Sequence, residues 1–195
     1  MAKDFRQQYE EIFSKHIKRD GAREIFNYLK GTDFFTAPAS VRRHSSYHGG
    51  LVEHHVKVYH RFCKLLEGEY GKEWLDKNHE SVAIIALLHD VCKINCYKTE
   101  MRNTKVDGAW VQKPYFAYED SLPYGHGEKS VYIISGYMKL TRDEAFAINW
   151  HMGGFDPRNS NGLSPCGAAF YQFPIAAIFH AADFLTTYLD EKIVE

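Results

Sequence analysis

Hydrophobic residues recur every three or four positions over most of the chain, which is the spacing that places them on one face of an α-helix. Polar and glycine-rich stretches separate these runs and mark the ends of the expected helices. Residues 67–80 are predicted as an exposed, charged connector, and residues 153–168 as a loop rich in glycine, proline, asparagine and serine. The expected helical segments are 4–30 with a break at Asp20-Gly21, a long helix from Leu51, a central helix over about 80–93, a helix ending near Leu140, a helix from Thr141 to His151, and a last helix from about Pro174 to Ile193.

One segment, residues 97–119, departs from the helical pattern. Its β-forming residues flank Asp107-Gly108, a dipeptide typical of a two-residue β-hairpin turn. Cations such as Lys98 and Arg102 alternate there with aromatic residues. That mixture suits a phosphate and a base, and it also decorates solvated hairpins, so both interpretations stay open.

Length, charge and cysteine content narrow the class of protein. The chain has 195 residues, enough for one domain with its own core, and no repeat or linker divides it. The formal charge of −1 provides no overall field toward nucleic acid or anionic lipid. Four cysteines without a CxxC pair indicate reduced thiols rather than a disulfide framework. With no signal-peptide pattern and no membrane-spanning apolar run, we expect a cytoplasmic protein without a membrane partner.

The apolar run at residues 84–88 continues directly into His89 and Asp90, and Lys93 follows. A buried helix rarely holds a histidine and a carboxylate together unless something pairs with them. Two interpretations fit this doublet: a cation bound by both side chains, and a buried His-Asp hydrogen bond beside a surface lysine. Other polar residues lie in or at the ends of apolar helices in the same way, which favours the cation. The full set is His54, His89, Asp90, His126, His151 and Asp183.

Four imidazoles and two carboxylates on separate helices would each need a buried partner, and one or two divalent cations satisfy them all. Imidazole and carboxylate ligands without thiolate suit Mn, Fe, Co, Ni or Mg, and Zn also fits. Any one of these residues alone is more often structural than catalytic. The whole set predicts a metal site.

The ordered series of these residues resembles the HD-domain metal-dependent phosphohydrolases. The series H…HD…H…H…D is similar to the longer, dinuclear form of the motif. Its opening is similar to that of HD proteins with 3′–5′ exoribonuclease activity and of phage and bacterial HD hydrolases. The matching pieces are Gly49-Gly50-Leu51-Val52-Glu53-His54, Leu87-Leu88-His89-Asp90-Val91-Cys92-Lys93, Gly125-His126-Gly127, Trp150-His151-Met152-Gly153 and Ala182-Asp183.

The resemblance covers about residues 43–189 and implies a fold. That fold is a single all-α HD domain over residues 1–195, a helical bundle of about six to eight helices. Residues 1–40 would form an N-terminal helical extension, and residues 97–119 a small β-hairpin insertion at the rim of the site.

The resemblance also implies roles for individual residues. His54, His89, Asp90 and Asp183 are expected to hold one metal ion, and Asp90 to bridge to a second ion held by His126 and His151. Asp90 and Lys93 are the expected catalytic residues. Lys93 would face the scissile phosphate, and Cys92 stands where glycine is common in the family. The expected substrate-binding residues are Arg42, Arg43, His44, His48, Lys98 and Arg102.

The implied activity is hydrolysis of a phosphate ester of a nucleotide or a nucleic-acid end by a metal-activated water. A small nucleotide is favoured over a polymer because the chain is nearly neutral. The alternatives are a catalytically silent nucleotide-binding module and a dinuclear-iron oxygenase. The presence of all six expected ligands argues against the first, and Lys93 favours hydrolysis over the second. The expected cofactor is one or two divalent ions (Mn, Fe, Ni, Co, Mg or Zn), and the sequence predicts no oligomeric state.

Overall fold

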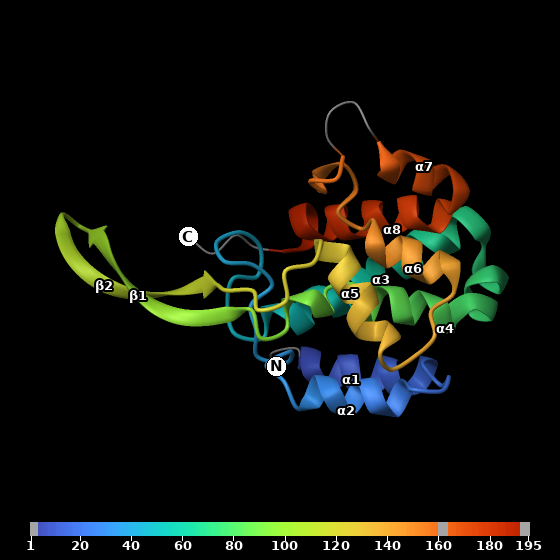
Figure 1. The fold of residues 1–195 in the computed structure, drawn as a ribbon, viewed down its shortest axis with the longest axis horizontal. Helices are drawn as coiled ribbons and strands as arrows, with labels where there is room; N and C mark the ends of the chain where they lie inside the picture. Colours follow the sequence, from blue (N-terminus) through green and yellow to red (C-terminus); the bar gives the residue numbers. More distant parts are fainter. Residues whose placement is uncertain (1–3, 160–163, 192–195) are drawn as a thin grey trace.

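The computed structural model describes residues 4–159 and 164–191. Eight α-helices and one antiparallel hairpin account for most of these residues, so the fold is mostly helical with a small β insertion, and the hairpin projects away from the packed helices (Figure 1). The elements in chain order are α1 (Phe5–His16), α2 (Ala22–Lys30), α3 (Gly50–Tyr70), α4 (Lys72–Leu88), the 3-10 turn η1 (Val91–Lys93), β1 (Tyr97–Val106), β2 (Ala109–Tyr118), α5 (His126–Ser135), α6 (Arg142–Asn149), the 3-10 turn η2 (Gly153–Phe155), α7 (Pro165–Gln172), α8 (Pro174–Leu185) and the π-helical turn η3 (Thr186–Asp190).

The expected helical pair at the N-terminus, the long helix and the helix that begins after Thr141 are all confirmed. The last of these, α6, begins with a capping box. The Thr141 hydroxyl accepts from the Glu144 amide at 3.2 Å, and the Glu144 carboxylate accepts from the Thr141 amide at 2.8 Å. These two bonds satisfy amide groups that no helical carbonyl can reach.

The predicted connector over residues 67–80 is wrong. Helix α3 runs on to Tyr70, and α4 begins at Lys72 after the single residue Gly71, whose φ of 82° reverses the chain. The segment is charged because most of its side chains face solvent, while Leu75 is buried on the other face of α4. One buried face is enough to hold a helix.

This correction changes the position of the His-Asp doublet. Helix α4 ends at Leu88, so His89 is its C-terminal cap and Asp90 lies beyond the helix. Residues 91–93 form the turn η1 instead of a continuing helix. The doublet therefore lies at a helix end, where the chain is free to turn both side chains toward the same point.

The predicted loop over 153–168 is also corrected in part. Helix α7 begins within it, at Pro165, because proline is accepted at a first helical position, where its missing amide is no loss. Residues 160–163 of the loop lie outside the described residues. The last helix begins at Pro174 as expected, but regular α-helix ends at Leu185 and η3 follows; the predicted end at Ile193 lies outside the described residues.

The hairpin forms as predicted. Its two strands pair from Tyr97 opposite Tyr118 to Val106 opposite Ala109. Asp107 and Gly108 both have positive φ, 49° and 85°, as a type I′ turn requires. Most of its side chains are exposed, so the hairpin contributes little to the core.

The hydrophobic core lies around α3 and α4, which pack against each other and against α1, α6 and α8. Residues Ile84, Leu87 and Leu88 of α4 are completely buried, directly before the doublet. The N-terminal helix is part of this core, because the buried Tyr9 hydroxyl donates to the Leu87 carbonyl at 2.8 Å. That carbonyl is in the last turn of α4, where no helical amide follows to bond it. Among the described residues no single helix is long and apolar enough to cross a membrane, although the bent pair of α7 with α8 and η3 passes that test when joined.

We predict that Tyr9→Phe lowers the free energy of unfolding by about 1–3 kcal/mol, because the buried Leu87 carbonyl loses the hydrogen bond from the Tyr9 hydroxyl. Tyr132→Phe is the matched control, since Tyr132 is exposed and should change stability very little. Chemical denaturation of both variants measures the difference. Equal stability of the two would show that this bond does not hold α1 to α4.

Candidate metal centre

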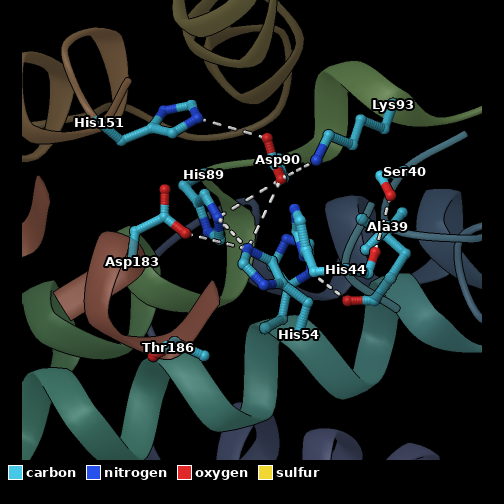
Figure 2. A network of polar contacts seen from close by, with 12 residues as sticks. Ala39, Ser40, His44, His54, His89, Asp90, Lys93, His151, Asp183 and Thr186 are labelled. Carbon is cyan, nitrogen blue, oxygen red and sulfur yellow. Dashed lines mark hydrogen bonds and ion pairs between the residues drawn. The ribbon is translucent and has the colours of Figure 1, made fainter. Parts of the chain in front are cut away.

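The six predicted ligands come together at one end of the helical bundle, from five separate segments. Figure 2 shows five of them, His54, His89, Asp90, His151 and Asp183, directed toward one another. The segments that position them are α3 for His54, the C-terminal end of α4 for His89 and Asp90, the start of α5 for His126, the turn after α6 for His151, and α8 for Asp183.

The carboxylate of Asp90 lies at the centre of the cluster, and its two oxygens face different imidazoles. Oδ1 is 2.8 Å from Nε2 of His126 and 3.4 Å from Nε2 of His151. Oδ2 is 3.6 Å from Nε2 of His89 and 3.8 Å from Nε2 of His54. The same Oδ2 accepts from Lys93 Nζ at 2.6 Å. Asp90 thus separates two sets of imidazoles, one on each oxygen.

The first set consists of His54, His89 and Asp183. Nε2 of His54 is 3.2 Å from Nε2 of His89 and 3.2 Å from Asp183 Oδ1. Each ring donates outward through Nδ1, His89 to the Ala86 carbonyl at 3.0 Å and His54 to Glu191 Oε1 at 3.0 Å. A neutral imidazole with its proton on Nδ1 presents a lone pair at Nε2. Two such lone pairs 3.2 Å apart repel unless a proton or a metal ion lies between them.

The second set consists of His126 and His151. His151 is oriented in the same way as His89, because its Nδ1 donates at 2.7 Å to the carbonyl of Ile148, three residues before it. Its Nε2 is buried and has no hydrogen-bond partner among the described residues. A buried polar atom without a partner is unfavourable, and a cation would satisfy this one. The other such atom among the described residues is Nε2 of His55, whose ring lies 6.3 Å from the ring of Tyr9 and 5.1 Å from that of Phe34 between centroids.

Burial and charge set the protonation of these side chains. Burial lowers the pKa of His89 well below its usual value, so this imidazole is neutral. Burial raises the pKa of Asp90, but the charge of Lys93 and the hydrogen bond with His126 outweigh burial and hold this pKa well below its usual value. Asp183 is likewise kept ionised, because contact with His54 overcomes burial and lowers its pKa. Ionised carboxylates and neutral imidazoles are the forms that bind metal.

Two imidazoles of the cluster, His151 and His54, are exceptions. Burial lowers the pKa of His151, but the contact with the Asp90 carboxylate outweighs burial and raises this pKa above its usual value. His54 is affected in the same way. Burial lowers its pKa, but the carboxylates of Glu191 and Asp183 outweigh burial and raise it to about 10. The His54 imidazole is therefore protonated as long as no metal ion is bound at its Nε2 atom. A metal ion at Nε2 would displace that proton and take over the pairing with Asp183.

Sequence analysis missed Glu191, which follows η3. Its carboxylate contacts both His44 and His54, and these contacts hold its pKa below the usual range despite burial. A carboxylate on the outer nitrogen of a metal-binding histidine fixes the tautomer and makes the inner nitrogen a stronger donor. The sequence around Glu191 does not indicate this role, because Glu191 lies 137 residues from His54 along the chain.

A cavity of about 600 Å³ opens over the cluster. Of the predicted substrate-binding residues, Arg43 and His44 line it, as does Lys93. The aromatic residues on its wall are Tyr97, Phe155, Phe184 and Tyr188. A groove of about 750 Å³ beside α1 and α2 is larger, but none of the predicted ligands lines it.

The other four predicted substrate-binding residues do not line this cavity: Arg42, His48, Lys98 and Arg102. Lys98 pairs with Glu119 at the surface, and Arg102 lies over the ring of Tyr115. His48 Nδ1 lies 3.2 Å from the Thr36 carbonyl. The hairpin carries its cations outward because it extends away from the helices (Figure 1).

No model of a known protein family matches the chain, and no curated protein or solved structure matches it either. The geometry of the site is therefore the basis for its interpretation. Among the described residues, donor atoms lie within 4.8 Å of one another in four overlapping groups: His54 with His89 and Asp90, His89 with His151 and Asp183, Asp90 with Cys92 and His126, and His44 with His54 and Glu191. Buried histidines and aspartates thus lie close enough together to bind a metal ion.

We predict that Glu191→Ala weakens metal binding about 10- to 100-fold, because His54 loses the acceptor that fixes its Nδ1 proton. Asp190→Ala is the matched control, since the Asp190 side chain pairs with Arg61 instead of the cluster. Titration of both variants with Zn²⁺ in competition with a chelator gives the affinities. Equal affinity for the two variants would exclude Glu191 from the site.

Proposed function

We propose that the protein is a metal-dependent phosphohydrolase or phosphodiesterase of the HD-domain type. Its strongest support is the placement of Asp90. The two oxygens of this carboxylate face two sets of imidazoles, and these imidazoles are predicted metal ligands. The predicted order of the motif, with Asp90 as a bridge, matches this arrangement. His54, His89 and Asp183 would hold one ion, and His126 and His151 the other.

Divalent ions in this position would supply Lewis acidity toward a phosphate and acidify water. The chain's own contribution is charge and orientation. Lys93 lies beside Asp90 with 13% of its side chain exposed, and although desolvation lowers its pKa, the Asp90 carboxylate outweighs this effect and raises the pKa above the usual value. Its ammonium group is therefore a permanent cation on the wall of the cavity, suited to neutralise charge on a phosphate. Arg43 lines the same cavity and can bind phosphate oxygens with two parallel N–H groups.

The substrate we propose is a nucleotide or the end of a nucleic acid. Aromatic side chains line the same cavity as these cations: Phe155 stacks on Phe184 at 6.1 Å between ring centroids, and Phe184 contacts Tyr188 at 4.7 Å. Phe155 and Tyr188 stay 63% and 62% exposed, so their faces are available to a ligand. Aromatic faces stack on bases, and cations bind phosphates. A nucleotide combines both groups in one molecule.

The first experiment is elemental analysis of protein purified without a metal-affinity column, together with phosphate release from a panel of nucleotides. About two transition-metal ions per chain and release from a preferred nucleotide would support the proposal. Two irons without phosphate release would favour the oxygenase alternative. Absence of both metal and turnover would favour a silent nucleotide-binding module.

We predict that Asp90→Asn abolishes both metal retention and phosphate release, because both sets of imidazoles lose their shared anionic ligand. Asp120→Asn is the matched control, since Asp120 also pairs with a lysine, Lys129, outside the cluster. Metal content and circular dichroism of both variants are measured together. Full metal content in folded Asp90→Asn would show that the site assignment is wrong.

We predict that Lys93→Met retains the metal but lowers kcat about 100- to 1,000-fold, because a preorganised charge on the phosphate is lost. Lys98→Met should leave kcat unchanged, since that lysine pairs with Glu119 away from the cavity. Steady-state kinetics on metal-loaded protein compare the two. Equal kcat values would remove Lys93 from the reaction.

A further inference from the structure

The thiol of Cys92 lies against the second set of imidazoles and has no part in the function proposed above. Its Sγ is 3.4 Å from Nδ1 and 3.7 Å from Nε2 of His126, and 3.8 Å from Oδ1 of Asp90. The residue is buried, with only 2% of its surface exposed. These three side chains have their donor atoms within 4.8 Å of one another.

Backbone contacts hold Cys92 in this position. The Cys92 amide, in η1, donates to the hydroxyl of Ser130 at 3.1 Å. Ser130 follows His126 by four residues on α5, so both lie on the face of that helix that packs against η1. The thiol and the imidazole are thus brought together by the packing of two elements.

The start of α5 is held equally closely against the end of α6. A Cβ atom on Gly127 would lie 2.2 Å from the carbonyl oxygen of Asn149, so only glycine allows this approach. Asn149 stands two residues before His151, and the contact therefore places His126 beside His151, with ring centroids 5.1 Å apart. Three segments converge on one small volume beside Asp90 Oδ1.

We propose that Cys92 is a thiolate ligand of the metal ion held by His126 and the Oδ1 atom of Asp90. The inference rests on the proposed metal centre and adds a third kind of donor, a thiolate, to the imidazole and carboxylate donors. The thiol releases its proton to solvent when the ion binds, because the thiolate is the form that coordinates metal.

The distances fit a tetrahedral site. Zinc bonds of about 2.0–2.1 Å to nitrogen or oxygen and about 2.3 Å to sulfur place neighbouring ligand atoms about 3.4–3.6 Å apart. The distances from Cys92 Sγ to Nε2 of His126 and Oδ1 of Asp90, 3.7 and 3.8 Å, are close to this spacing. His151 gives an independent indication, because its buried Nε2 has no partner and lies 3.4 Å from the same Asp90 oxygen. The donors would be the Cys92 sulfur, the Asp90 oxygen and a His126 nitrogen, which lie within 4.8 Å of one another, and His151 approaches the same Asp90 oxygen.

A sulfur ligand changes which metal the site prefers. Thiolate is a soft donor that favours Zn²⁺ or Fe²⁺ over Mg²⁺ and Mn²⁺, which prefer oxygen. The expectation of a ligand set without thiolate is thereby revised for the second ion. The first set, His54, His89 and Asp183, contains no sulfur, so the two ions would have different surroundings.

Two measurements test the proposal. X-ray absorption at the zinc edge of zinc-loaded protein reports the atoms bonded to zinc, and the optical spectrum of cobalt-loaded protein reports whether sulfur is bonded to cobalt. We expect about one sulfur neighbour at about 2.3 Å for every two zinc ions. We also expect a sulfur-to-cobalt charge-transfer band. Both signals should be lost in Cys92→Ala and in Cys92→Ser. They should remain in Cys96→Ala, the matched control, because Cys96 is also buried but its Sγ contacts Lys129 and backbone carbonyls instead of the cluster.

The zinc-edge measurement on wild-type protein can by itself overturn the proposed role of Cys92, without any variant. Bound zinc with only nitrogen and oxygen neighbours, in one or two sites, would overturn the role of Cys92 and leave the proposed function intact. A sulfur signal that persists in folded Cys92→Ala would also overturn it, since another cysteine would be the ligand. Wild-type protein that retains no zinc or cobalt would overturn the proposed metal centre itself.

Discussion

The buried carboxylate of Asp90 is the constraint on which the rest of the site depends. An ionised carboxylate removed from water is strongly unfavourable unless charges and hydrogen bonds compensate it. Here the compensation comes from Lys93 and from imidazoles that approach both oxygens. Because those imidazoles belong to different helices, the helices have to converge on this one group. The same convergence that satisfies Asp90 leaves donor atoms close enough together to hold metal.

Helix ends supply the orientation of the imidazoles. His89 caps α4 and His151 follows the end of α6, and each donates through Nδ1 to a carbonyl three residues before it. The last carbonyls of a helix have no helical partner, so this bond satisfies an otherwise unpaired acceptor. It also directs Nε2 of each ring toward Asp90. The same hydrogen bond thus satisfies a carbonyl at the helix end, fixes the tautomer of the imidazole and orients its Nε2 atom.

The surroundings of the cluster divide into regions with different chemistry. Lys93 and Arg43 bring positive charge to the cavity, and Phe155 and Tyr188 bring exposed aromatic faces. Cys92 contacts His126 of the second set of imidazoles but does not line the cavity. The proposed function depends on the residues that line the cavity, whereas the proposed sulfur ligand depends on the packing of η1 against α5. The two proposals can therefore be judged separately.

The sequence by itself determined the helices, the hairpin and the list of polar residues that apolar helices cannot bury alone, because periodicity and turn chemistry depend on neighbouring residues. It misjudged residues 67–80, since charge along one face does not prevent a helix, and α4 begins at Lys72. Only the tertiary structure decided that Lys98 and Arg102 point away from the cavity, that Glu191 reaches His54, and that Cys92 lies beside His126. Those relations join residues far apart in the chain or depend on the direction in which an element leaves the core, and packing between distant segments sets both.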